Sequence, residues 1–185
     1  MVIFNRTHGE NRLLNYELGD DSRWKIDPSD EVLIYVYLRK KVHRHPLPLN
    51  NIFEFDVFER EPWMLDSRNS FRDRKYYFFD IKNHRFENMD RRQVGNGEWR
   101  SMEKNKEVSL PNNMFIGRKN TLEFWKIEGD EHVKTEWVMD EFRITPTIHP
   151  SKVSWLAAYR IFKTILPSEI DFTLEDENLS PPHSP

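Results

Sequence analysis

The sequence predicts an α+β domain in which short helices precede a run of antiparallel β-strands. Apolar residues recur at helical spacing near the N-terminus, whereas aromatic and β-branched residues follow a period of two after residue 75. Glycines separate the later runs, as expected for turns between strands. Phe, Trp and Tyr make up 14% of the 185 residues, so a core can form although aliphatic residues are few.

The first helix is expected to begin within residues 27–31. Asp27 or Ser29 can cap it, Pro28 is tolerated in a first turn, and the acids there oppose the helix macrodipole. Apolar residues between 33 and 38 form its buried face, and the cations at 39–41 suit its C-terminal end. Prolines at 46 and 48 stop it. Residues 61–65 predict a second short helix with Pro62 in its first turn.

Three later runs have strand character, namely residues 75–79, 121–125 and 136–144. Residues 155–162 are ambiguous, because Ala157 and Ala158 favour helix while the aromatic and β-branched residues after them favour strand. The glycines expected at turns are Gly95, Gly97, Gly117 and Gly129.

Charge is unevenly distributed along the chain. Residues 72–106 hold ten Lys or Arg against six Asp or Glu, whereas residues 164–185 hold five acids and no base. This split suggests a nucleic-acid-binding face and an acidic tail, although a solvated surface of mixed charge has the same composition. The tail resembles an activation segment in composition, with a disordered, proline-ended terminus as the simpler interpretation.

Several kinds of site are disfavoured by the sequence. The absence of cysteine excludes disulfides and cysteine-ligated zinc, and fits a reducing compartment. No apolar run is long enough to span a membrane, and no signal peptide is visible, so a soluble intracellular protein is expected. No nucleophile elbow, phosphate loop or dinucleotide fingerprint indicates an enzyme, a cofactor or a small-molecule substrate. His43 and His45 have metal-ligand spacing, but a solvated loop is the simpler interpretation.

Eight blocks then follow one another in an order that resembles the NAC domain of plant transcription factors. They are residues 28–31, 46–49, 61–63, 77–79, 95–100, 116–119, 134–139 and 160–163. Gly95-Asn96-Gly97-Glu98-Trp99-Arg100, for example, is similar to the family's Gly-Ser-Gly-Tyr-Trp-Lys. The resemblance implies a twisted antiparallel sheet flanked by short N-terminal helices. It also implies zinc-free binding of double-stranded DNA through an edge strand in the major groove.

The resemblance places the DNA-binding region within residues 82–106, with further cations after it. The cations assigned to DNA contact are Arg85, Arg91, Arg92, Arg100, Lys104, Lys106, Arg118, Lys119 and Lys134. Lys and Arg donate to phosphates and to purine edges, as such a strand requires. Trp99 is expected to anchor the strand in the core rather than to contact bases.

Two residues of the inserted strand depart from the family pattern. Glu103 stands where the family has Gly, and its charge would oppose nearby phosphates. Met102 replaces a hydroxyl donor.

Dimerisation through the N-terminal segment is also implied, with Trp24 and Lys25 at the matching positions. There the family pairs an Arg with a helix Glu of the other subunit. Lys25 keeps a cation, but Val32 occupies the Glu position, so this ion pair is absent. The expected protein partner is a second copy of the chain or a related family member, and the missing ion pair weakens or redirects this association.

The expected organisation is a flexible arm (1–21), a NAC-like DNA-binding domain (22–163) and a disordered acidic tail (164–185). The leading hypothesis is a nuclear, sequence-specific transcription factor that inserts a basic strand into the major groove. The alternative is a NAC-like interaction module that modulates related proteins and binds DNA weakly itself.

Overall fold

The computed structural model describes residues 27–48, 52–65, 75–82, 90–144 and 156–164. Their elements are α2 (Asp30–Val32), η1 (Leu33–Leu38), α3 (Arg39–Val42), β1 (Phe53–Glu54), η2 (Pro62–Met64), β2 (Tyr76–Phe79), β3 (Arg91–Val94), β4 (Gly97–Ser109), β5 (Phe115–Glu128), β6 (Glu131–Ile144) and β7 (Ala158–Lys163). The predicted arm (1–21) lies outside the described residues, as does the predicted tail after residue 164.

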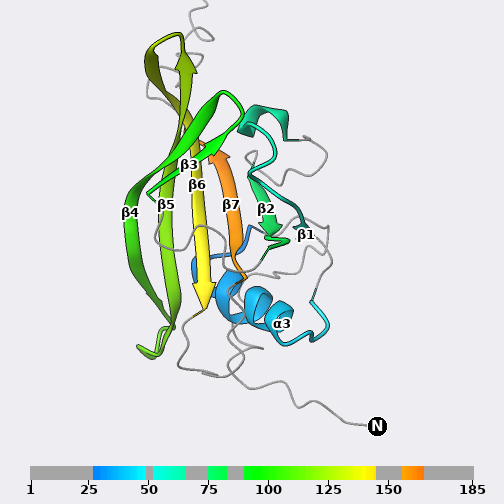
Figure 1. The fold of residues 1–185 in the computed structure, drawn as a ribbon. Coiled ribbons are helices and arrows are strands. Elements are labelled where there is room, and N and C mark those ends of the chain that lie inside the picture. The colour runs from blue at the N-terminus through cyan, green and yellow to red at the C-terminus, as the bar shows by residue number, and fades with distance from the viewer. Residues whose placement is uncertain (1–26, 49–51, 66–74, 83–89, 145–155, 165–185) are drawn as a thin grey trace, which may run out of the picture.

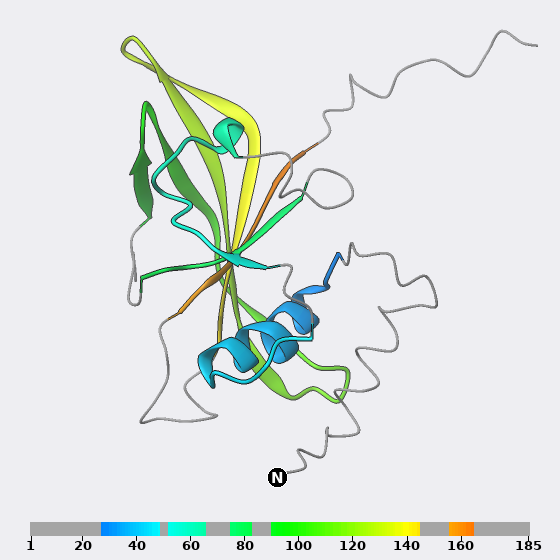
Figure 2. The ribbon, with the colours of Figure 1, turned by 90° about the vertical axis from the view of Figure 1, so that its right-hand side faces the viewer.

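The strands form one seven-stranded sheet in the order β1-β2-β7-β6-β5-β4-β3 (Figure 1). One pairing departs from the predicted antiparallel arrangement, because the short β1 pairs with β2 in parallel. All other pairings are antiparallel. The strands fan about a common centre when the sheet is viewed near its edge (Figure 2), so the sheet is strongly twisted. The α+β class is therefore confirmed, and the ambiguous residues 155–162 contribute strand β7.

The three N-terminal pieces α2, η1 and α3 form one continuous helical segment from Asp30 to Val42. Ser29 caps it, since its hydroxyl oxygen accepts a hydrogen bond from the Val32 N–H at 3.4 Å. The middle piece, η1, is π-helical, and all of its residues except Tyr35 are buried. The helix expected from the sequence is thus confirmed, with a wider middle turn than the sequence indicated. The second predicted helix is the single 3₁₀ turn η2.

Two of the four glycines assigned to turns occupy strands instead. Gly95 and Gly129 have φ of 55° and 62°, as turn glycines do. Gly97 begins β4 and Gly117 lies inside β5, so the turn prediction was wrong for these two. At Gly117 a Cβ atom would lie 2.4 Å from the carbonyl oxygen of Arg143 on β6. Glycine is needed there because the neighbouring strand approaches closely, and not because the chain turns.

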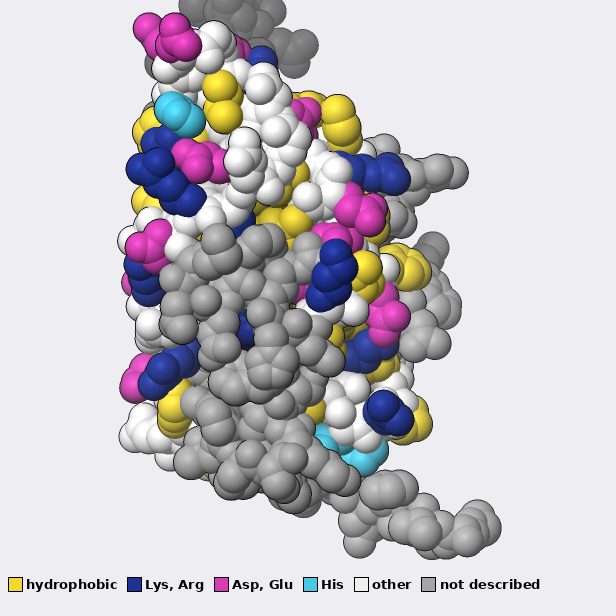
Figure 3. Space-filling view, in the orientation of Figure 1, with side chains coloured by type: hydrophobic (Ala, Val, Ile, Leu, Met, Phe, Trp, Pro, Cys, Tyr) yellow, Lys and Arg dark blue, Asp and Glu magenta, His cyan; other side chains and the backbone are white. Residues whose placement is uncertain are grey.

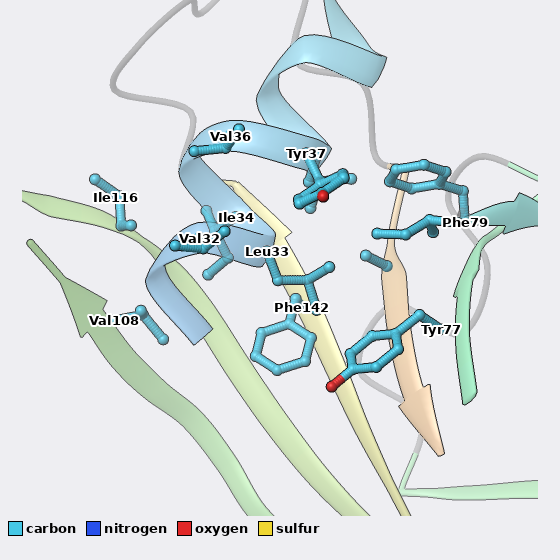
Figure 4. Packing of buried hydrophobic residues seen from close by; sticks show 13 residues of the cluster. Val32, Leu33, Ile34, Val36, Tyr37, Tyr77, Phe79, Val108, Ile116 and Phe142 are labelled. Atoms are coloured by element: carbon cyan, nitrogen blue, oxygen red, sulfur yellow. The ribbon is translucent and has the colours of Figure 1, made fainter. Parts of the chain in front are cut away.

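Two hydrophobic clusters cover the opposite faces of the sheet. Alternate residues of β2 enter different clusters, because side chains of a strand point alternately to its two faces. The first cluster packs the helical segment against the sheet, and Figure 4 shows Leu33 and Ile34 of η1 close to Phe142 of β6. The second cluster includes Trp99 of β4 and Phe124 of β5. The two clusters together fix the sheet from both sides.

A buried ion pair joins the edge strand β3 to β6. Arg92 Nη2 lies 2.5 Å from Glu141 Oε2, and both side chains are almost fully buried. In the sheet, β3 and β6 are separated by β4 and β5. Three strand spacings of a flat sheet would place them about 14 Å apart. The contact is possible only because the sheet curls, so the ion pair and the curl support each other.

The carboxylate of Glu141 is held in its charged form by its neighbours. Burial alone would raise its pKa, but the guanidinium groups of Arg92 and Arg143 outweigh burial and keep the pKa of Glu141 below its ordinary value. Asn120 also donates a hydrogen bond to it, at 3.3 Å. A carboxyl whose pKa is lowered by folding stabilises the fold above its unfolded pKa, about 4.3. This contribution is lost as the pH falls through the lower folded value.

Substitution of Arg92 by Met should lower the free energy of unfolding by about 3 kcal/mol, because it leaves the buried Glu141 carboxylate with fewer partners. Urea denaturation measures this change. Lys163→Met is the matched control, since Lys163 forms an exposed ion pair with Glu136 and its loss should cost less than about 1 kcal/mol. Equal losses for the two variants would show that the buried pair does not hold the sheet.

Candidate nucleic-acid interface

Strand β4 extends well past the end of β3. The two strands pair only between Gly97 and Arg100 of β4, and beyond that point β4 has β5 as its one strand partner within the described ranges. Residues 102–107 are all exposed. They lie between Trp99, which packs in the second cluster, and Val108, which packs in the first, and they belong to neither cluster. We call residues 102–107 the β4 edge segment. It lies on the outer rim of the sheet (Figure 1), with one row of backbone groups facing away from β5.

The β4 edge segment is irregular. From Ser101 to Lys106, β4 advances five residues while its partners on β5 advance three, from Leu122 to Lys119. Extra residues of this kind form β-bulges, which bend a strand and redirect its side chains. Asn105 has a φ of 54°. Its N–H donates to the side-chain oxygen of Asn120 at 2.8 Å.

Glu103 stands where the resembled NAC family has glycine, and it lies in this irregular stretch without backbone strain. The left-handed backbone conformation falls on Asn105, a residue type that tolerates it, and not on Glu103. The Glu103 carboxylate accepts hydrogen bonds from Lys106 Nζ at 3.3 Å. The substitution therefore changes the charge of the β4 edge segment and leaves its backbone shape compatible with a side chain.

Arg100 lies just before the β4 edge segment and is held by two neighbours. Its Nε and Nη2 atoms donate to Glu98 Oε1 at 2.7 and 2.6 Å. Its guanidinium group stacks over the ring of Trp125, 4.4 Å from the centroid. Glu98 and Trp125 are cross-strand partners, which places both on the same face as Arg100. The arginine is therefore pre-positioned on the face of β4 opposite Trp99.

Glu98 also draws in two further basic side chains. Arg91 Nη1 and His132 Nδ1 lie 3.8 and 3.7 Å from the same Oε1 atom. Only 13% of the Glu98 side chain is exposed. One shielded carboxylate thus neutralises part of the positive charge around Arg100.

Most other cations assigned to DNA contact are exposed and paired with acids. Lys104 pairs with Asp90, Lys106 with Glu103 and Lys134 with Glu123. Figure 3 shows this alternation of basic and acidic side chains along the rim formed by β4 and the β5–β6 hairpin. Exposed pairs of this kind are weak, typically about 0–1 kcal/mol, so a phosphate can replace the carboxylate.

Two neighbouring cations of β5 differ in their surroundings. Arg118 is exposed beside the ring of Phe115, and no carboxylate of the described residues lies within ion-pair distance of it. Lys119 is only 13% exposed and binds Asp30 at the start of the helical segment, 2.6 Å away. Arg118 is thus free to meet a phosphate, whereas Lys119 ties the helix to the sheet.

The structure removes Arg92 from the surface. Its guanidinium group is buried against Glu141, so in this fold it is not presented to solvent as a DNA contact would be. Arg91 and Arg92 alternate across the strand, and only Arg91 points outward, a difference that the sequence assignment did not make. Arg85 lies outside the described residues.

Trp99 is fully buried and packs edge-to-face on Phe124, with ring centroids 5.0 Å apart. Gly97, two residues earlier, lies under the same Phe124 ring, where a Cβ atom would be 2.5 Å from it. This packing supports the anchoring role expected for Trp99. It fixes the start of β4, so that Arg100 emerges on the opposite face.

Sequence reasoning missed Glu98 and Trp125. Glu98 could have been found, because it stands two residues before Arg100 and therefore shares a strand face with it. The resembled family has Tyr at this position. Trp125 could not have been found, because its place beside Arg100 depends on the register between β4 and β5.

The residues expected at a dimer interface are mostly outside the described ranges, as Trp24 and Lys25 are. Val32, at the position of the family's Glu, is described and only 2% exposed. It packs in the first cluster beside Leu33 and Ile34. The position that forms an ion pair in the resembled family therefore belongs to the core of this chain.

No helix in the described ranges is long and apolar enough to cross a membrane. The described residues also contain no group of three or more His, Asp or Glu side chains placed to hold a metal ion. His43 and His45 lie near each other, with ring centroids 5.8 Å apart.

The chain was compared with known proteins. Residues 22–144 match the family model described as No apical meristem (NAM) protein. The chain is 32% identical over 137 residues to NAC transcription factor 47 of Arabidopsis thaliana, covering 71% of this chain and 38% of that protein. It is 33% identical over 124 residues to NAC transcription factor 25 of Arabidopsis thaliana and to NAC domain-containing protein 1 of Solanum lycopersicum. Those matches cover 66% of this chain and 38% and 44% of the relatives.

The chain thus spans about two fifths of the length of these curated relatives. The matched region contains the helical segment, strands β1–β6 and the β4 edge segment. These findings confirm the resemblance drawn from the sequence blocks. The chain belongs to the No apical meristem (NAM), or NAC, family.

Proposed function

We propose that this chain is the DNA-binding domain of a nuclear transcription factor and binds duplex DNA through the β4 edge segment and Arg100. The observation that carries the proposal is the exposure of residues 102–107 on a strand edge whose cations are held only by surface ion pairs. A major groove is wide enough to admit a β-ribbon, and a strand edge presents both side chains and backbone groups to it.

The roles of the cations follow from their positions. Arg100 is the candidate for base contact, because its fork of donors can bind guanine O6 and N7 together. Lys104, Lys106 and Arg118 are exposed on or beside the segment and are the candidates for phosphate contact. Arg91 and Lys134 extend this surface along the same face. Lys119 and Arg92 support the fold and are not part of the proposed contact set.

The acids of this surface set the strength of binding. Glu98 competes with DNA for Arg100, and Glu103 competes for Lys106. A carboxylate that loses its partner to a phosphate then lies near negative charge, which opposes binding. The proposed domain therefore binds DNA more weakly than one with the same cations and neutral neighbours.

A second candidate function is an interaction module that pairs with a related protein and modulates it, with little DNA binding of its own. The neutralised cations of the β4 rim favour it. The buried Val32 argues that any such pairing does not use the family's ion pair at this position.

Titration against a randomised duplex pool at several salt concentrations separates the two functions. DNA binding through the proposed contacts should enrich a core sequence, and log K should fall with log salt at a slope of about −0.9 per phosphate contacted. An unenriched pool with a flat salt response would eliminate the DNA-binding proposal and favour the interaction module.

Arg100→Ala should weaken binding to the enriched duplex by about 1–3 kcal/mol and relax the preference at one base pair. Lys163→Ala is the matched control, because Lys163 is also paired with a Glu and lies over a Trp ring, but on β7. Competition binding against duplexes altered at single positions provides the measurement. A uniform loss at all positions would make Arg100 a phosphate contact instead.

Glu103→Gln should tighten DNA binding several-fold, because it removes a negative charge beside the phosphates and releases Lys106. Glu103→Gly removes the bulk as well and should tighten binding further if the backbone approaches the DNA closely. Glu136→Gln, on β6 away from the β4 edge segment, is the control for a general charge effect. Unchanged affinity in both Glu103 variants would mean that the β4 edge segment does not face the DNA.

A further inference from the structure

We propose that Met102 contacts the 5-methyl group of a pyrimidine in the major groove and so favours thymine at one position of the recognised sequence. The inference rests on the proposed function and adds to it the base chemistry that one side chain selects. It concerns a residue at which this chain differs from the pattern of its family.

Met102 is unusually free of packing for an apolar residue. Its side chain is 59% exposed, the largest exposure among the described large hydrophobic residues. It lies at the first register shift of β4, where Ser101 faces Leu122 and Glu103 faces Thr121, so Met102 has no cross-strand partner. A side chain in this position is not committed to the core, and the bulge directs it away from the regular ladder.

Basic side chains stand two residues to either side of Met102. The half-buried Arg100 precedes it, and the exposed Lys104 follows it within the β4 edge segment. If Arg100 contacts a base edge and Lys104 a phosphate, the residue midway between them lies against the groove. An isolated exposed methionine carries no such implication, because single exposed apolar residues are common. The placement between a proposed base-contacting cation and a proposed phosphate-contacting cation gives Met102 its candidate role.

The major groove offers an apolar side chain one apolar partner on the base edges, which is the C5-methyl group of thymine. Cytosine has a hydrogen atom at that position, and 5-methylcytosine restores the methyl group. The thioether of methionine is flexible and polarisable, so it can adapt to a methyl group whose position varies slightly. The chemistry recognised is therefore the C5-methyl group of thymine, and 5-methylcytosine carries the same methyl group on the other pyrimidine.

The test uses the duplex enriched in the pool titration. Each thymine is replaced singly by uracil, which removes only the methyl group, and the dissociation constants of the unchanged chain, Met102→Ser and Met114→Ser are measured. Met114 is the matched control, because it is also exposed, at 41%, but lies in the β4–β5 turn. We expect one position where uracil weakens the unchanged chain and Met114→Ser about fourfold, the effect of burying one methyl group.

At that position Met102→Ser should bind the thymine and uracil duplexes equally. In a second arm, cytosine or 5-methylcytosine replaces the thymine at that position of the duplex, and binding of the unchanged chain is measured. A gain from methylation means that Met102 accepts either methylated pyrimidine, and no gain assigns the contact to thymine alone; both results support a methyl contact when the uracil effect depends on Met102.

A uracil penalty of equal size in Met102→Ser and the unchanged chain would overturn the inference while leaving the proposed function intact. The inference also fails if no thymine of the enriched duplex is sensitive to loss of its methyl group. Absence of any enriched duplex would instead overturn the proposed function, and the inference with it. The two failures are therefore distinguishable in one set of measurements.

Discussion

The buried ion pair between Arg92 and Glu141 is the constraint on which the shape of this domain depends. It connects an edge strand to a strand three places away in the sheet, which is possible only when the sheet is curled. A buried charge pair costs desolvation, so its contribution lies less in net stability than in excluding flatter arrangements that would leave either charge alone. The hairpin of β3 and β4 is thereby held over the second cluster, into which Trp99 of β4 packs.

The exposure of the β4 edge segment follows from that arrangement. The two clusters reach β4 only near its ends, at Trp99 and Val108, and nothing apolar among the described residues holds the stretch between them. Within the described ranges, β3 pairs only with residues 97–100 of β4 and does not reach this stretch. A long strand edge that no other described strand pairs is normally a hazard for aggregation, and charges and bulges are the usual protection. Here the same charges and bulges are also what a groove-binding strand requires, so one feature serves solubility and proposed recognition together.

Much of the fold could be predicted from the sequence, because its signals are local. The Ser29 cap, the apolar face after it and the alternating runs of the later strands each depend on near neighbours. Gly117 was misassigned because its reason is a close approach of β6, which no local pattern contains. The candidate site was less predictable, because it too depends on contacts between strands that are distant in the sequence. Arg91 and Arg92 are neighbouring arginines that point to opposite faces of β3, and the curl of the sheet buries the face that holds Arg92.

In the proposed complex, DNA lies against the open edge of β4. Amide hydrogen exchange of the chain, with and without the enriched duplex, tests it directly. New protection is expected for the backbone amides of residues 102–107, with β1 and β2 at the opposite edge unchanged. Protection confined to the helical segment or to the β1–β2 edge, with residues 102–107 exchanging as in the free chain, would contradict it.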